Sequence, residues 1–249
     1  MKHLALLFLL LIFSAFSISV EAQKSPVRSK SNRKITEKKG NPAIVVDRRL
    51  SVLRNSPSLY AMPLQRMGVG REVFVLGEKT GDGVLFYQVR TSNNMAGWVQ
   101  AEAIIGSFRK NDDQRLAKLV QASDRFDKID KAVIFLEQFP KSILRPSILL
   151  LIGDLMEEEA LSLSKAAAKS LDRSEMAASG APLHSFYLNF PSLDRYRKIG
   201  IRFLFNINTK TFHYDGDAWL EIVRKFPNSS EVEEAQNRLD TLKEKMAKK

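Results

Sequence analysis

Between Ala43 and Gly106, short β-type runs alternate with turn-forming residues, and this pattern constrains the fold more than any other feature. Each run is rich in β-branched, aromatic or leucine residues and spans only a few positions: Leu50–Arg54, Glu72–Leu76, Phe86–Arg90 and Gly97–Val99. Glycine, proline, asparagine and aspartate residues separate the runs, and such residues end strands and form tight turns. Several strands in so short a stretch predict a compact antiparallel β-barrel.

In their order and spacing, these runs resemble a bacterial SH3 domain over about a quarter of the chain. The segment Leu50–Ser58 matches the family's first strand and its proline-containing turn, and the later runs follow in the family's order. The sequence departs from the family where Leu53, Asn55-Ser56 and Phe86 replace the favoured Arg, Gly and Trp. The resemblance implies a barrel that binds a ligand without catalysis, and the departures leave the preferred ligand open.

The alternating pattern places one set of valines in the core of this barrel: Val52, Val73, Val75, Val89 and Val99. The resemblance implies that aromatic residues and loops beside the first turn bind the ligand. This points to Arg54, Tyr60 and Trp98 as the ligand-binding residues. Tyr60 lies in a turn-rich stretch with little core to fill, whereas Trp98 is either a surface residue or a core residue.

Residues 1–22 have the pattern of a signal peptide. Lys2 and His3 precede the apolar run Leu4–Phe13, and Val20-Glu21-Ala22 resembles a cleavage site. The alternative is an uncleaved membrane anchor, because no charge occurs between Leu4 and Val20. We expect an exported protein, periplasmic or extracellular. The chain has no cysteine, which excludes disulfides and cysteine nucleophiles and favours a bacterial source.

Residues 23–42 form a basic segment that we expect to be a disordered linker. From Gln23 to Gly40 it contains seven lysines and arginines against one glutamate, Glu37, and it has few apolar residues. In an exported protein, such a segment would meet an anionic membrane surface or a wall polymer, and no nucleic acid is expected. The alternative is a tether that only aids solubility.

After Gly106 the apolar spacing changes from period two to helical period, which predicts a helical domain over residues 111–249. One helix is expected to begin near Pro146 and to run to about Leu171. We expect a loop over residues 173–182. Ser230 and Glu233 have the spacing of a capping box at the start of the last helix.

The helical half contains an internal repeat at an offset of 87 residues. Phe135–Ser142 matches Ile222–Ser229, and both copies carry a Phe-Pro-x-Ser turn between two apolar stripes. Proline ends the first helix and serine opens the second in each copy. The turn resembles that of tetratricopeptide-like helical hairpins in bacterial envelope proteins. The family's period of 34 residues does not divide 87, so the two copies flank an insertion.

That insertion, at about residues 173–217, is rich in aromatic residues. Ile201–Phe205 and Lys210–Tyr214 have alternating patterns on either side of Asn206–Thr209, which predicts a β-hairpin. The aromatic side chains are expected to pack against the helices rather than to bind a ligand.

The sequence contains few candidates for catalytic or metal-binding residues. The histidines beyond residue 22 are His184 and His213, and neither has a ligand-spaced partner. Asp215-Gly216-Asp217 lacks the glutamate of a calcium loop, so Asp217 is expected to cap a helix. Glu157-Glu158-Glu159 is interpreted as a solvated helix face. We therefore expect no cofactor, no metal and no enzyme activity.

The sequence thus predicts a multidomain chain, a small all-β SH3-like barrel followed by a mainly α-helical hairpin domain with a possible β-hairpin insertion. The preferred function is a non-catalytic envelope protein, whose barrel binds peptidoglycan or a peptide and whose helices dock a protein partner. The alternative is an envelope hydrolase with a site in the aromatic insertion near His184 or His213. A nucleophile and base that converge at either histidine would favour this alternative.

Overall fold

The computed structural model describes residues 40–248. The predicted signal peptide, and the basic linker as far as residue 39, lie outside the described residues. The first strand begins at Asn41, so the prediction that the linker extends to Pro42 is wrong by two residues. No helix within the described range is long and apolar enough to cross a bilayer.

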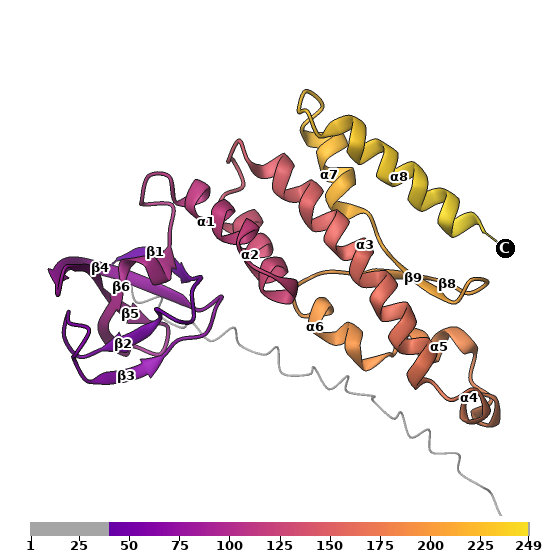
Figure 1. Cartoon of the computed structure of the whole chain (residues 1–249), viewed down its shortest axis with the longest axis horizontal. Helices are drawn as coiled ribbons and strands as arrows, with labels where there is room; N and C mark the ends of the chain where they lie inside the picture. Colours follow the sequence, from indigo (N-terminus) through magenta and orange to yellow (C-terminus); the bar gives the residue numbers. More distant parts are fainter. Residues whose placement is uncertain (1–39, 249) are drawn as a thin grey trace, which may run out of the picture. The chain divides into compact units, whose positions relative to one another are not determined.

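The first part of the described chain is an antiparallel sheet with the strand order β3-β2-β6-β5-β4-β1-β7 (Figure 1). Its elements are β1 (Asn41–Val45), β2 (Val52–Arg54), β3 (Pro63–Arg66), β4 (Glu72–Gly81), β5 (Val84–Thr91), β6 (Ala96–Gln100), the short 3-10 helix η1 (Ala101–Ala103) and β7 (Ile104–Ile105). The prediction of an SH3-like β region in this part is confirmed. Pro63 begins an edge strand, where its missing N–H group is tolerated.

Alternation along the strands builds the core of this sheet. On β5, Tyr87 and Val89 are buried, while Gln88 between them is half-buried. The prediction for Val73, Val75, Val89 and Val99 is confirmed, since all four are buried. The prediction for Val52 is wrong. Val52 is only half-buried and Leu53 is fully buried instead. Because both residues are aliphatic, the sequence did not decide which of them faces inward.

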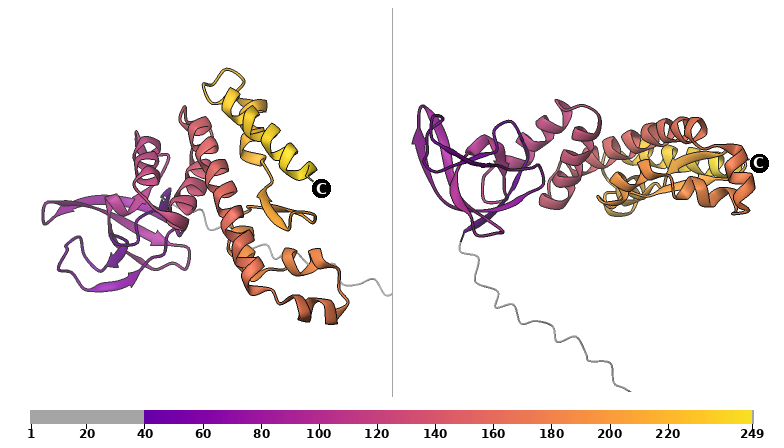
Figure 2. Two further views of the ribbon diagram at one scale, coloured as in Figure 1. Left: turned by 45° about the vertical axis from the view of Figure 1, so that its right-hand side comes forward. Right: turned by 90° about the horizontal axis from the view of Figure 1, so that it is seen from below.

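The second part is mainly helical, as predicted (Figure 2). Its elements are α1 (Asp112–Gln121), α2 (Arg125–Gln138), α3 (Arg145–Ser170), α4 (Arg173–Ser179), α5 (Leu183–Leu188), the 3-10 helix η2 (Pro191–Leu193), α6 (Asp194–Arg197), β8 (Phe203–Asn206), β9 (Thr211–Tyr214), α7 (Asp217–Lys225) and α8 (Val232–Ala247). The helix expected near Pro146 is α3, with proline in its first turn. The expected β-hairpin is formed by β8 and β9.

The repeated Phe-Pro-x-Ser turns have equivalent hydrogen bonds. The Phe139 amide donates to the carbonyl of Phe135 at 2.9 Å, and that of Phe226 donates to Ile222 at 2.9 Å. The next bond runs from Ser142 to Phe139 at 3.1 Å, and its counterpart from Ser229 to Phe226 at 3.0 Å. The 87-residue repeat is therefore a repeat of backbone conformation, which joins α2 to α3 and α7 to α8.

Three local predictions in this part are wrong. Residues 173–179 form helix α4 rather than a loop, because the Asp172 side chain accepts hydrogen bonds from two first-turn amides. Ser230 does not cap α8, which begins at Val232 without a side-chain cap. Asp217 is the first residue of α7 rather than its cap. Its amide donates to the Asp215 side chain at 3.2 Å.

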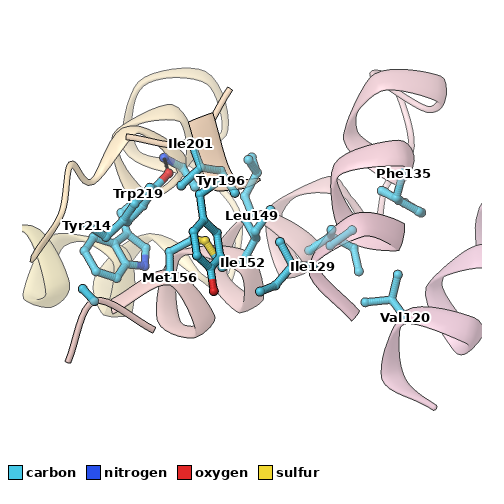
Figure 3. Packing of buried hydrophobic residues seen from close by; sticks show 14 of the residues in the cluster. Val120, Ile129, Phe135, Leu149, Ile152, Met156, Tyr196, Ile201, Tyr214 and Trp219 are labelled. Atoms are coloured by element: carbon cyan, nitrogen blue, oxygen red, sulfur yellow. Dashed lines mark hydrogen bonds between the residues drawn. The ribbon is translucent and has the colours of Figure 1, made fainter. Parts of the chain in front are cut away.

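Aromatic and aliphatic side chains from α1, α2, α3, α6, α7 and β9 fill the helical core (Figure 3). Trp219 of α7 packs against Gly153 of α3, where a Cβ atom would lie 2.3 Å from the indole Nε1. Tyr214 makes an edge contact with Trp219, and Tyr187 stacks on Phe205 at 4.5 Å. These contacts agree with the expected packing of the aromatic residues.

Candidate functional site

One row of side chains crosses the outer face of the barrel. Arg54 of β2 is the register partner of Trp98 of β6, and Trp98 is in turn the partner of Gln88 of β5. Side chains of directly opposed residues lie on the same face of an antiparallel sheet. Gly77 of β4 continues the row beyond Gln88. Because glycine has no side chain, nothing rises from β4 at that position.

Trp98 is a surface residue of the barrel. Its neighbours Gly97 and Val99 are buried, while Trp98 itself is half-buried. A Cβ atom on Gly97 would lie 2.7 Å from the carbonyl oxygen of Arg54 and 2.8 Å from the Leu53 Cγ. The close packing of β2 on Gly97 therefore fixes the phase of β6 and directs Trp98 outward. Of the two alternatives for Trp98, the core position is wrong.

The loop between β2 and β3 is clamped to the turn between β4 and β5. The carboxylate of Asp82, in that turn, accepts hydrogen bonds from the Ser58 hydroxyl and the Leu59 amide, both at 2.7 Å. These two bonds lower the pKa of Asp82 below its ordinary value. A Cβ atom on Gly81 would lie 1.8 Å from the Pro57 carbonyl oxygen, so the two backbones can approach only because residue 81 is glycine.

The clamped loop carries the most exposed aromatic residue of the barrel. Tyr60 is 90% exposed, and its amide donates to the Ser58 hydroxyl at 3.2 Å. The Arg54 guanidinium donates from Nη1 to the carbonyl of Ala61 at 2.7 Å. Arg54 therefore links the sheet row to the residue directly after Tyr60. The structure thus brings Arg54 next to Trp98 and joins both to the loop that carries Tyr60.

Sequence reasoning missed several residues of this face. Asp82 holds the loop, and its only signal in the sequence is its position between Gly81 and Gly83. Gln88 could be identified only once the register of β5 and β6 was known. Exposed apolar side chains also lie on and beside the loop: Leu59 at 36%, Met62 at 62% and Leu64 at 41%.

A second group of polar residues lies in the helical part, around His213 of β9. His213 Nδ1 lies 3.0 Å from Oε1 of Glu157 on α3, and His213 Nε2 lies 3.0 Å from the Thr211 hydroxyl. The Lys245 ammonium of α8 donates to the same Glu157 oxygen at 2.7 Å. His184 is exposed on α5 and takes no part in this group. Of the two histidines, His213 therefore has converging polar side chains and His184 does not.

The interpretation of residues 157–159 as a solvated face is wrong for two of the three. Glu157 is largely buried and belongs to the His213 group, and Glu159 accepts a hydrogen bond from the Tyr196 hydroxyl at 2.7 Å. Glu158 is exposed. Within residues 40–248, no cluster of three or more histidine or acidic side chains could hold a metal ion.

Residues 51–105 match the family model of the bacterial SH3 domain. The match covers the barrel from the residue before β2 to the end of β7. The chain has no significant match among the curated proteins or the solved structures.

Proposed function

We propose that the barrel binds a short peptide, free or as the stem of peptidoglycan, on the face formed by Arg54, Tyr60 and Trp98. In this proposal the chain is an exported envelope protein whose barrel binds its ligand without catalysis, and its helical region docks a protein partner. The observation that carries the proposal is an aromatic side chain, Tyr60, that is 90% exposed on a loop clamped at both Ser58 and Leu59.

The clamp matters because a loop that is already ordered loses little conformational entropy when a ligand binds. Freezing a mobile side chain or loop opposes association, and a loop that is already held avoids part of this cost. Exposed aromatic residues at such positions commonly dominate the energy of an interface. Tyr60 buries no surface within the barrel that would explain its presence, which supports a role toward a ligand.

Arg54 and Trp98 support a peptide as the ligand. A half-buried indole offers a flat apolar surface, and the neighbouring guanidinium offers several N–H donors, of which Nη1 is used by the Ala61 carbonyl. A peptide presents both apolar side chains and carboxylate or carbonyl acceptors to such a pair. Bacterial SH3 domains commonly bind peptidoglycan or peptides, which agrees with this chemistry.

The proposal also places the protein outside the cytoplasm of a bacterium. This part rests on residues 1–22, with their basic start, apolar run and cleavage-like end. The basic segment after them suits contact with anionic lipid or wall polymers. The helical region supports a protein partner through its two equivalent helical hairpins, α2–α3 and α7–α8.

Co-sedimentation with purified sacculi tests the peptidoglycan form of the ligand, and titration with soluble peptidoglycan stem peptides tests the free form. We expect Tyr60→Ala to weaken binding on the order of tenfold, as for truncation of an interface anchor. Ile143→Ala is the matched control, because Ile143 is 89% exposed but lies between α2 and α3. Equal binding by Tyr60→Ala, Ile143→Ala and wild type would overturn the proposal.

A further inference from the structure

A groove with a volume of about 680 Å³ lies between α3, β9 and α8. This volume is within the range of small-molecule sites. Leu161 of α3 and Phe212 of β9 are the apolar residues of its lining, and the other lining residues are polar or charged. Thr211, His213 and Glu157, which form a hydrogen-bonded series, line the same groove. A concave groove in which polar groups converge is a candidate small-molecule site.

Thr211, His213 and Glu157 form a chain of hydrogen bonds in that order. The Thr211 hydroxyl is 3.0 Å from His213 Nε2, and His213 Nδ1 is 3.0 Å from Glu157 Oε1. Thr211 and His213 are two positions apart on β9, which places both side chains on one face of the strand. A hydroxyl, an imidazole and a carboxylate in this order are the arrangement by which an alcohol is activated as a nucleophile.

Glu157 is held in place from several sides. Its Oε2 accepts the Tyr214 amide at 2.8 Å, and its Oε1 accepts the Lys245 ammonium at 2.7 Å. The amide of Phe212, on the same edge of β9, donates to the buried Ser164 hydroxyl of α3 at 2.7 Å. Side chains of α3 thus satisfy the edge of β9 that β8 leaves free, and this fixes the strand relative to Glu157.

These bonds determine which nitrogen of His213 carries its proton. Burial raises the pKa of Glu157, but hydrogen bonds from His213, Lys245 and the Tyr214 amide together hold it below its ordinary value, so the carboxylate is ionised. An ionised carboxylate accepts only, so Nδ1 of His213 must donate to it. In a neutral imidazole, Nε2 is then free to accept the Thr211 proton.

We propose that this groove is a hydrolytic site for esters, with Thr211 as the nucleophile, His213 as the general base and Glu157 as a positioning residue. Thr211 Oγ1 attacks the acyl carbon, and its proton passes to His213 Nε2. The bond from the acyl carbon to the alcohol oxygen then breaks, and the leaving oxygen takes the proton from Nε2. The product is a threonine ester of the acid and a free alcohol.

Water completes the cycle. A water molecule attacks the threonine ester while its proton passes to His213 Nε2, and that proton returns to Thr211 Oγ1 as the acid leaves. One ester and one water give one acid and one alcohol, with no change in oxidation state. Leu161, which is 53% exposed, offers an apolar contact to the acyl group, and Lys248 adds a positive charge to the lining of the groove.

Covalent labelling tests the site directly. We expect a fluorescent fluorophosphonate to form an adduct on Thr211, located by peptide mass spectrometry, and p-nitrophenyl butyrate to be hydrolysed. Thr211→Val should lose the adduct, and His213→Gln should lower the rate of labelling and hydrolysis on the order of 100-fold. Thr211→Ser should keep the adduct at residue 211 and gain rate, because a primary alcohol is less hindered.

Thr80→Val is the control, since Thr80 is exposed on β4 in the barrel and should react like wild type. Circular dichroism of each variant establishes that it is folded. Absence of an adduct at residue 211 in both wild type and Thr211→Ser would overturn the proposal, as would an unchanged hydrolysis rate in Thr211→Val. Binding of peptide by the barrel is measured separately with Tyr60→Ala, so either proposal can fail while the other holds.

Discussion

The barrel face and the groove use hydrogen bonds in opposite ways. On the barrel, Asp82 and Arg54 fasten a loop so that Tyr60 stands out into solvent. In the groove, Glu157 gathers His213 and Lys245 into a largely buried polar cluster. The first arrangement presents an apolar group, and the second orients polar ones. The comparison teaches that one carboxylate can hold an aromatic side chain out toward solvent, whereas another holds polar side chains together.

The largest expected effect comes from a substitution in the core of the barrel, which lowers stability without changing the proposed binding face directly. Val75 is buried in the barrel core, and Val75→Asp would place an unpaired carboxylate there. The cost of several kcal/mol is comparable with the whole stability of a small domain. We expect the variant to lose peptide binding together with the ordered environment of Trp98, measured by near-ultraviolet circular dichroism. A variant that melts like wild type would show that the assignment of β4 is wrong.

The matching experiment in the helical part replaces Glu157. In Glu157→Leu, the His213 imidazole, the Tyr214 amide and the Lys245 ammonium all lose their acceptor. Leaving a buried donor unpaired costs about 1–3 kcal/mol, so we expect a clear fall in the free energy of unfolding. Urea denaturation measures it. Glu158→Leu, at the exposed neighbour, is the control and should change stability little.

The contribution of Glu157 to stability should depend on pH in the acidic range. The pKa of Glu157 in the folded protein lies below its ordinary value of 4.5, so between these two values the unfolded chain binds the proton more readily. The stability from Glu157 is therefore complete above about pH 4.5 and is lost as the pH falls through the folded pKa. We expect Glu157→Gln to lose less stability than wild type over this acidic range. Parallel losses in both proteins would contradict the assigned role.

The smallest expected effect concerns the clamp on the barrel loop. Asp82→Ala removes the acceptor for the Ser58 hydroxyl and the Leu59 amide. Because these groups are exposed, water can replace the bonds, and we expect the melting temperature to change little. Peptide affinity should fall severalfold, since the loop must then be ordered on binding. Asp113→Ala, outside the barrel, should leave affinity unchanged. If Asp82→Ala binds as tightly as wild type, the clamp does not serve recognition.

The barrel was the more predictable of the two regions because its signals are local. Turn residues and alternating strands within residues 43–106 indicated the fold, and Arg54, Tyr60 and Trp98 followed from the resemblance. The sequence did not decide between Val52 and Leu53 for the core, since both are aliphatic. The position of Trp98 was also open, because it depends on the close approach of β2 to Gly97.

The groove was harder to predict because its residues come from distant parts of the chain. Glu157 and His213 are 56 residues apart, and Lys245 lies on the last helix. No motif spacing links them, so Glu157 was interpreted as part of a solvated face. The repeat at an offset of 87 residues was visible in the sequence, but the hairpin that brings His213 to α3 belongs to the insertion between the copies.

The most direct test of the central claim uses the two tryptophans of the chain. Trp219 is buried in the helical core and Trp98 is half-buried on the barrel face, so Trp219→Phe leaves Trp98 as the only indole. Its fluorescence is then followed during titration with soluble peptidoglycan stem peptides. We predict a saturable change in Trp98 emission that Tyr60→Ala weakens on the order of tenfold. The account would be contradicted if the Trp219→Phe protein bound to sacculi while its Trp98 emission stayed unchanged during the titration with stem peptides, both with Tyr60 and with Tyr60→Ala.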